Sequence, residues 1–356
     1  MITNKTLELM RELTQVIAVS GNEIKISKIL QNYYGKYTDE IVYDNLGSVY
    51  GVKKSKKPNA PKVMISSHMD EVGFIIKDFT KNGLIKVLSL GPACKQGLLG
   101  QRVRVMTNDG EEYKGTIVAK SNSDKDKVLD ADKILIDIGA SSIEDFSSLG
   151  IRLGDSIVID GSFEVLATGK RIMSKAWNSR YGCALGVEIL EALKDVELDV
   201  DLYVGCTVQH EVGLRGAQTA TNLISPDLAI VLDCLTADDI SGDSDAVGKL
   251  GEGVLINFYD KSMMPNRALL NHLMTICKNN GIPNQFYYSM CDGDGGWIHK
   301  LLRGCPTLNA CICARNVENN SSIIDVNDYL AARESVTKVV KSLNTEMIEM
   351  FRTENR

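Results

Sequence analysis

Long apolar runs are missing from this sequence of 356 residues. No segment approaches the ~18 consecutive apolar residues that mark a membrane-spanning helix. Residues 1–5 also lack the apolar core of a secretory leader. We therefore expect a cytoplasmic protein that has no membrane partner.

Concentrated positive charge is missing too. Lysine and arginine number 40 against 46 acidic residues, and the only basic run, residues 53–57, lies in a polar stretch that contains proline. This dispersion argues against a nucleic-acid partner. The nine cysteines, an odd number, fall largely inside apolar runs, as buried thiols do in a reducing compartment. Cys291, Cys311 and Cys313 are poorly spaced for a zinc knuckle, so no cysteine-based metal site is expected.

The sequence does contain enough apolar residues, 44%, for two domains with cores of their own. Between residues 73 and 162 it alternates in short segments that are broken by turns such as Asn82-Gly83 and Asp109-Gly110. Such spacing is typical of a small β-barrel or sandwich. Residues 1–72 and 163–356 instead alternate helices with apolar strands. We predict one α/β domain from these two segments, with residues 73–162 inserted as a β-rich domain.

Local patterns predict the elements of the α/β part. Apolar residues at helical spacing predict helices at residues 7–18, 22–34, 183–195, 267–280, 296–302 and 325–350. Short apolar runs predict strands at residues 41–43, 49–52, 63–66, 202–206, 229–233 and 308–313.

The most informative segment joins two polar side chains to the end of a predicted strand. His68 and Asp70 follow an apolar run and, being two residues apart, would lie on the same face of an extended chain. Open α/β sheets form their sites at the carboxyl ends of strands. An imidazole oriented by a nearby acid is a common metal ligand, so this segment predicts a metal site.

Three further segments carry matching residues. His210 and Glu211 follow a second predicted strand, Asp233 ends a third, and Asn178 precedes the helix predicted from residue 183. With these segments the chain resembles the M42 family of metallo-aminopeptidases, the glutamyl and deblocking aminopeptidases that include tetrahedral dodecamers. The resemblance extends from residue 20 to the last predicted helix.

The resemblance implies a central mixed sheet flanked by helices, as in zinc peptidases, and an insert that forms a small β-barrel and helps subunits assemble. It implies an aminopeptidase that acts on short peptides, and a homo-oligomer that could be as large as a dodecamer. It also implies a site for two divalent metals, for which zinc, cobalt and manganese are the candidate ions.

Carried over residue by residue, the metal ligands would be His68, Asn178, Glu211, Asp233 and Glu318. The family has a bridging aspartate where this chain has Asn178, and a histidine ligand where it has Glu318. A neutral amide cannot offset the repulsion between two adjacent dications. We therefore predict at most one tightly bound metal per chain.

The catalytic positions are also altered. His210 replaces the glutamate that is the family's general base, whereas Asp70, which orients the histidine ligand in the family, is retained. Asp294 matches an aspartate in the family's glycine-rich stretch, and Arg315 follows a predicted strand, so both are predicted to contact substrate. Lys175 and Arg180, which flank Asn178 in the sequence, are expected at solvated positions.

These substitutions leave two hypotheses. In the first, the exchanged imidazole and carboxylate of His210 and Glu318 form a rearranged working site, in which His210 serves as base or as ligand. In the second, catalysis is impaired or lost. If it is lost altogether, the chain is a silent homologue that binds peptides or assembles. Catalysis that needs groups placed within about half an ångström rarely survives three such changes, which favours the second hypothesis.

Overall fold

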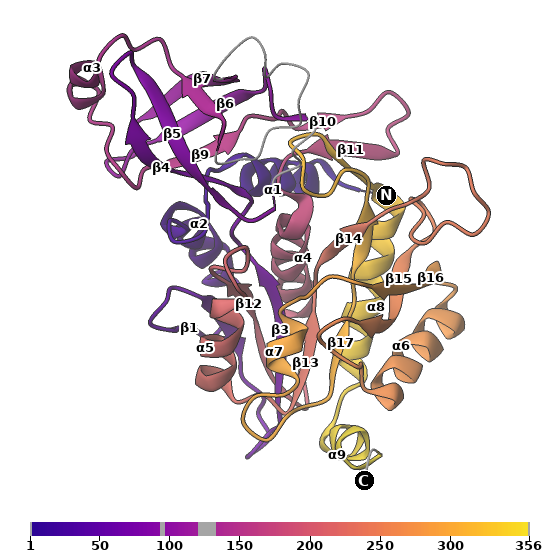
Figure 1. Ribbon diagram of the computed structural model, residues 1–356. Helices are drawn as coiled ribbons and strands as arrows, with labels where there is room; N and C mark the ends of the chain where they lie inside the picture. Colours follow the sequence, from indigo (N-terminus) through magenta and orange to yellow (C-terminus); the bar gives the residue numbers. More distant parts are fainter. Residues whose placement is uncertain (1, 93–96, 120–132, 355–356) are drawn as a thin grey trace.

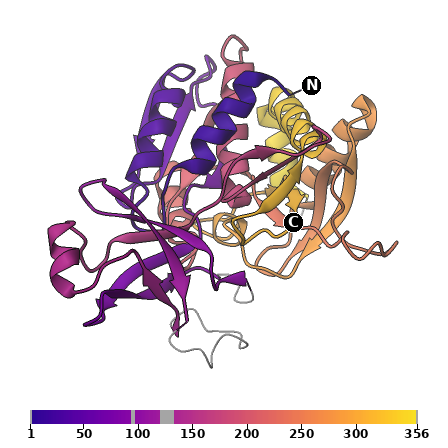
Figure 2. The same ribbon diagram turned by 90° about the horizontal axis from the view of Figure 1, so that it is seen from above.

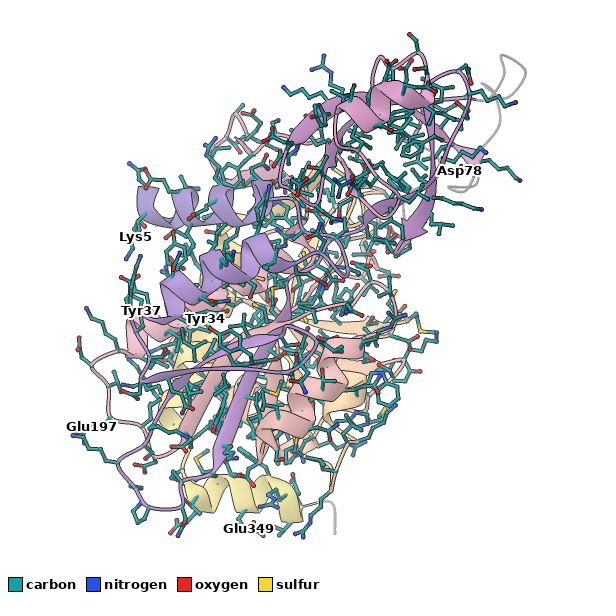
Figure 3. All side chains as sticks on the ribbon, turned by 90° about the vertical axis from the view of Figure 1, so that its left-hand side faces the viewer. Lys5, Tyr34, Tyr37, Asp78, Glu197 and Glu349 are labelled. Atoms are coloured by element: carbon teal, nitrogen blue, oxygen red, sulfur yellow. The ribbon has the colours of Figure 1, made fainter. Side chains whose placement is uncertain are left out.

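The computed structural model describes residues 2–92, 97–119 and 133–354 of the chain. Figure 1 shows two parts, a β-barrel at the upper left and a larger layered body of helices and strands. The view from above separates the same two parts (Figure 2). Asp78 on the barrel and Glu349 on the last helix lie at opposite ends of the molecule (Figure 3). Within the described residues, no helix is both long enough and apolar enough to cross a membrane.

A six-stranded sheet forms the centre of the body. Its strands, in spatial order, are β1 (Glu40–Tyr43), β2 (Val49–Lys53), β12 (Asp201–Thr207), β3 (Lys62–His68), β13 (Leu228–Val231) and β17 (Thr307–Asn309). The last four of these run parallel, and β1 and β2 are antiparallel additions at one edge. Thr207 pairs with His68, so the carboxyl ends of neighbouring parallel strands meet at one edge of the sheet.

Helices cover both faces of this sheet. In chain order the helices of the body are α1 (Asn4–Gln15), α2 (Ile24–Tyr34), α4 (Trp177–Leu193), α5 (Arg215–Ile224), α6 (Arg267–Asn280), α7 (Gly295–Ile298), α8 (Val326–Ser342) and α9 (Thr345–Thr353). The remaining described helix, α3 (Ile143–Ser148), packs on the barrel through Phe146. The core on one face includes α4, α1 and α8, and the core on the other includes α5 and α7. Val63 and Ile65 of β3 join the first core and Met64 joins the second, which is the alternation that a strand imposes.

The closed barrel has a separate apolar core that includes Phe74, Val105 and Ile157. Its strands, in spatial order, are β4 (Gly73–Phe79), β5 (Leu84–Leu90), β8 (Leu135–Asp137), β7 (Glu112–Val118), β6 (Arg102–Met106) and β9 (Ser156–Ile159). Gly83 turns the chain between β4 and β5 with φ +77°, and a Cβ there would lie 2.1 Å from the Ala140 carbonyl oxygen, so only glycine fits. The predicted fold class, a mixed sheet flanked by helices with an inserted small barrel, is confirmed.

Smaller sheets complete the described part of the body. They are formed by β10 (Glu164–Val165), β11 (Arg171–Ser174) and β19 (Ser322–Asp325), by β14 (Cys234–Thr236) and β18 (Ile312–Ala314), and by β15 (Val254–Asp260) and β16 (Asn284–Ser289). The sequence patterns did not predict β15, β16 or α5. The helix α5 lies between Leu214 and Ser225, which both have positive φ, a conformation that apolar periodicity does not reveal.

Two predicted elements are divided in the structure. The prediction of a single helix at residues 325–350 was wrong, because Leu343 and Asn344 are extended. The Asn344 side chain caps the start of α9 by accepting a hydrogen bond from the Met347 N–H. The prediction of a single strand at residues 308–313 was also wrong, because β17 and β18 belong to different sheets. In both places the apolar pattern continues across a break that capping and strand pairing decide.

A buried ion cluster joins the two chain crossings between barrel and body. Glu71 lies where the chain leaves β3 for the barrel, and Lys175 follows β11 on the return. The Lys175 ammonium donates to both carboxylate oxygens of Glu71, at 2.6 and 2.7 Å, and Arg180 lies 3.4 Å from the same carboxylate. The prediction that Lys175 and Arg180 are solvated was wrong, because the two residues are only 2% and 0% exposed. Burial lowers the pKa of Lys175 to about 8.

We predict that Glu71→Gln lowers the free energy of unfolding by about 3–5 kcal/mol at pH 6, because two buried cations lose their carboxylate partner. Without Glu71 the pKa of Lys175 falls further below its value in the unfolded chain. The native state then binds fewer protons than the unfolded state, so stability recovers as the pH rises and the deficit is smaller at pH 9. Urea unfolding at both pH values measures this. Glu164→Gln, at an exposed position, is the control, and equal losses in the two variants would contradict the prediction.

Candidate metal centre

Three strand ends bring an imidazole–carboxylate cluster together. His68 is the last residue of β3, His210 lies three residues beyond the end of β12, and Asp233 lies two residues beyond the end of β13. One ligand atom from each of these side chains lies within 4.8 Å of the others. It is the one group of this kind that the described residues contain. Two imidazoles and a carboxylate are donors that zinc, cobalt and manganese accept.

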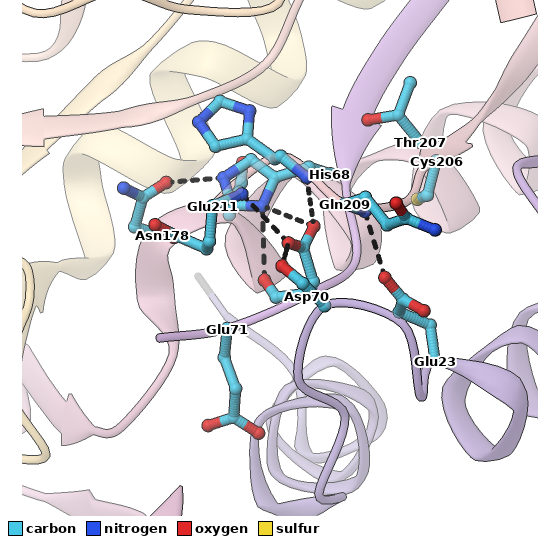
Figure 4. Close-up of polar contacts among 12 residues, drawn as sticks. Glu23, His68, Asp70, Glu71, Asn178, Cys206, Thr207, Gln209 and Glu211 are labelled. Atoms are coloured by element: carbon cyan, nitrogen blue, oxygen red, sulfur yellow. Dashed lines mark hydrogen bonds and ion pairs between the residues drawn. The ribbon is translucent and has the colours of Figure 1, made fainter. Parts of the chain in front are cut away.

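Asp70 holds the surrounding loops in place (Figure 4). Its carboxylate accepts hydrogen bonds from the backbone N–H groups of His210, at 3.1 Å, and Glu211, at 3.0 Å, and from the Ser20 hydroxyl, at 2.5 Å. His68 Nδ1 lies 3.5 Å from the same carboxylate. Burial alone would raise the pKa of Asp70, but the neighbouring His68 holds it below its usual range. Asp70 is therefore an ionised anchor between the chain's first loop and the two strand ends.

His210 forms a second imidazole–acid pair beside the first. Its Nδ1 atom is 2.8 Å from Asp294 Oδ1, and the Thr207 hydroxyl donates to Asp294 Oδ2 at 2.6 Å. The rings of His68 and His210 are stacked, with centroids 3.8 Å apart and planes inclined by 11°. Burial and His68 lower the pKa of His210, but Asp294 and Asp233 raise it and leave that pKa above its usual value.

Asn178 reaches His68 from the start of α4. Asn178 and Ser179 have non-helical φ and ψ angles, and the Asn178 Oδ1 atom lies 2.8 Å from His68 Nε2. His68 Nδ1 is also 3.1 Å from the Asp70 carbonyl oxygen. Burial lowers the pKa of His68, but Asp70 and other carboxylates raise it well above its usual value. Asn178 thus contacts His68 with a neutral oxygen, and its role as a metal ligand stays a prediction.

Glu211 and Glu318 lie apart from the three-residue cluster but line the same pocket. Burial raises the pKa of Glu211 to about 7. Its Oε2 atom would be 2.6 Å from a Cβ at Gly91, so glycine at that position leaves room for the carboxyl group. Glu318 is the more exposed of the two, and partial burial raises its pKa as well.

The pocket in front of the cluster has a volume of about 980 Å³. Acidic side chains dominate its charged lining: Glu211, Asp233, Asp238, Asp292 and Glu318. Lys261 and Lys300 also line it, and Lys261 is paired with Asp292 at 3.2 Å. Lys300 lies over the Trp297 ring, 4.4 Å from its centroid. The chamber is therefore large enough for a short peptide and favours a positively charged group.

The two predicted substrate contacts have other partners in the structure. Asp294 is buried and bound to His210 and Thr207. The Arg315 guanidinium forms two hydrogen bonds with Asp239, at 2.7 and 2.8 Å, and the residue is not among those that line the pocket. A substrate role for either residue stays a prediction.

Sequence reasoning did not assign roles to Ser20, Thr207 or Glu23. Glu23 accepts the backbone N–H of Gln209 at 2.9 Å, and Gln209 has φ +54°, so this contact fixes the loop that presents His210. Burial raises the pKa of Glu23 to about 7. Ser20 and Glu23 occur in the segment that begins the family resemblance, but their partners are distant in sequence and no local pattern points to them.

A mixed sheet with an inserted barrel and a donor cluster at the strand ends is the architecture of a zinc-peptidase-like protein. A sequence profile of the family described as M42 glutamyl aminopeptidase matches residues 47–334, and the chain belongs to this family. Its relatives include the glutamyl aminopeptidase of Lactococcus lactis, 31% identical over 344 residues that cover 95% of this chain and 96% of that protein. The resemblance identified from the sequence is therefore confirmed.

Solved structures agree. The TET aminopeptidase from a marine sediment archaeon of the Thaumarchaeota has a TM-score of 0.93 at 35% identity, covering 98% of this chain and 100% of that chain. The Pyrococcus horikoshii TET1 peptidase, described as assembling into a tetrahedron or a large octahedral shell, has a TM-score of 0.85 at 24% identity, covering 95% and 100%. This second likeness concerns the fold.

We predict that Asp70→Asn destabilises the chelator-treated protein by at least about 1–3 kcal/mol at pH 7, because the amide turns its NH₂ toward a backbone N–H and leaves a buried donor without an acceptor. Since the pKa of Asp70 is held low in the native state, the carboxylate stabilises the fold above the ordinary aspartate pKa, and this contribution is lost in acid. The difference from the unmodified chain should shrink as the pH falls toward 3. Asp78→Asn, on the barrel surface (Figure 3), should change little. Similar thermal melting curves for both variants at pH 7 would contradict the prediction.

Proposed function

We propose that this chain is a metallo-aminopeptidase-type protein for short peptides whose catalysis is impaired by the replacements at Asn178, His210 and Glu318. It holds at most one tightly bound divalent metal, with His68 and Asp233 as ligands and Glu211 nearby. The observation that carries the proposal is the donor cluster at the base of an acidic pocket, in a chain of the M42 family. The alternative is a silent homologue that binds peptides without cleaving them.

The donor set fits one ion better than two. His68 and Asp233 approach each other to 3.8 Å, but the residue that would stand between two ions, Asn178, offers a neutral oxygen. A single divalent ion supplies Lewis acidity, which polarises a scissile carbonyl and lowers the pKa of a water molecule. The neutral amide leaves the charge of a second ion without compensation.

The chain's own residues would select and orient the substrate. The acidic lining of the pocket attracts the ammonium group of a free peptide N-terminus, which internal peptide bonds lack. Asp70 fixes the orientation of His68 and the backbone of His210 and Glu211. Glu318 lies where a carboxylate replaces the family's imidazole, and it adds to the negative potential of the pocket. These properties support binding of an N-terminus more directly than they support rapid turnover.

We predict that the triple change Asn178→Asp, His210→Glu and Glu318→His raises aminopeptidase activity above that of the unmodified chain, by orders of magnitude, because residues that act as a unit are strongly non-additive. Initial rates on aminoacyl p-nitroanilides and dipeptides, with zinc, cobalt or manganese added, measure this. The matched controls are the three single changes, each of which should recover much less activity.

A different outcome would reject impairment. Metal-dependent turnover by the unmodified chain at a rate that the triple change lowers would show a rearranged working site. If neither protein cleaves peptides but both bind them in calorimetry, the silent alternative replaces the proposal.

We also propose that the chain forms a homo-oligomer, as closed symmetric assemblies are usual. The outer face of β15 and β16 exposes Phe258, Phe286 and Tyr288, at 46%, 62% and 44%, and such a patch is typical of an interaction surface. Light scattering should give a multiple of 39.0 kDa, up to a dodecamer, and Phe286→Asp should reduce the mass. Tyr43→Ser changes a similarly exposed aromatic on β1 and serves as control. A 39.0 kDa species at every concentration would contradict self-association.

A further inference from the structure

We propose that His210 is a direct metal ligand rather than a general base, and that His68, His210 and Asp233 form a one-ion centre in which Asp294 and Thr207 position His210. This assignment rests on the proposed function and deepens it, because it names the ligands of the single ion and adds two positioning residues. It differs from the ligand set that the family resemblance implies, which contains neither His210 nor Asp294.

The contacts of His210 fix which nitrogen faces the cluster. An ionised carboxylate only accepts hydrogen bonds, so the 2.8 Å contact between His210 Nδ1 and Asp294 Oδ1 places the proton on Nδ1. In the neutral ring Nε2 then carries the lone pair. Thr207 donates to the other oxygen of Asp294 at 2.6 Å, and Thr207 is paired with His68 in the sheet. A carboxylate behind a histidine in this way is the usual support of a metal-binding imidazole.

His68 is oriented in the same way from the other side. Its Nδ1 atom lies 3.1 Å from the carbonyl oxygen of Asp70, which only accepts. Its Nε2 atom therefore faces inward, 3.8 Å from Asp233 Oδ1, and donates a hydrogen bond to Asn178 Oδ1 at 2.8 Å. A metal that binds at this nitrogen displaces that proton. Both imidazoles thus carry an acidic residue behind Nδ1 and direct Nε2 toward the same space. Two histidines and one carboxylate are also the ligands of catalytic zinc sites that keep an open position.

The position of His210 argues against its acting as the general base. A base must stand off from the ion by the width of a water molecule, whereas the ring of His210 is stacked on that of the ligand His68 with centroids 3.8 Å apart. Zinc–nitrogen bonds of about 2.0–2.1 Å place two ligand atoms of a tetrahedral site about 3.3 Å apart. The three donor atoms lie within 4.8 Å, so binding requires a contraction of the cluster and a tilt of the two rings out of their parallel stack.

Titration of the full-length chain with Co²⁺ after chelator treatment tests the assignment, because the visible absorption of Co²⁺ reports its ligands without any turnover. We expect one Co²⁺ per chain by calorimetry. Loss of a supporting carboxylate typically costs 10–100-fold in affinity, so His210→Gln, which removes a ligand, should cost about 100-fold or more and change the absorption spectrum. His299→Gln is the matched control, because His299 Nδ1 contacts the Gly295 carbonyl oxygen outside the cluster.

Two positioning variants separate support of the metal from support of the fold. Asp294→Asn and Thr207→Val should each weaken Co²⁺ binding, by about 10–100-fold for Asp294→Asn, and Thr207→Ser should restore the affinity. Melting curves of the chelator-treated variants identify any general loss of structure. Glu318→Gln should leave the absorption spectrum unchanged, because Glu318 lies outside the donor cluster.

The results distinguish this inference from the proposed function. If His210→Gln binds Co²⁺ with unchanged affinity and spectrum, His210 is not a ligand and the inference fails, whatever the peptidase activity. A requirement for Glu318, or a second tightly bound Co²⁺, would overturn it as well. If His210 proves to be a ligand and no variant cleaves peptides, the inference holds and the peptidase function fails.

Discussion

The ionised carboxylate of Asp70 is the group on which the arrangement of the site depends. It lies two residues beyond the end of β3, where the chain crosses from sheet to barrel, and it joins Ser20, His68 and the backbone of His210 and Glu211. These contacts connect the first loop of the chain with two parallel strand ends. Asp70 is buried and is held in its charged form by His68. Its carboxylate supplies the acceptor that the backbone N–H groups of His210 and Glu211 need, and so fixes the geometry of their loop.

The next residue, Glu71, connects that geometry to the rest of the molecule. Its carboxylate points away from His68 in Figure 4 and binds Lys175 and Arg180. Arg180 lies on α4, two residues beyond Asn178. The same crossing from body to barrel therefore presents Asp70 to the candidate metal centre and Glu71 to the helix that supplies Asn178. A shift of the barrel relative to the body would act on both contacts, which makes the ion cluster a mechanical link between the two parts.

Much of the fold followed from local patterns, and the limits of those patterns are physical. Apolar runs that end in His68 and Asp233 predicted the convergence of strand ends, because parallel strands share one carboxyl edge. The bounds of α6 matched the periodicity, but the break before Asn344 did not appear in it. The pairing of His210 with Asp294 could not be predicted either, since 84 residues separate the two and only the folded sheet brings them together. Lys175 was misjudged because a buried cation is stable only beside a carboxylate, here Glu71, that sequence order does not reveal.

The charges of the exchanged residues are consistent with a change from two ions to one. At the three altered positions the resemblance implies an aspartate, a glutamate and a histidine, and this chain has Asn178, His210 and Glu318. The altered set therefore carries one negative charge where the family set carries two. The structure places Glu318 on the pocket wall and His210 among the donors, so the remaining charge lies outside the cluster. Two neutral imidazoles and Asp233 then provide a single anionic donor, which suits one dication and leaves a second without a counter-charge.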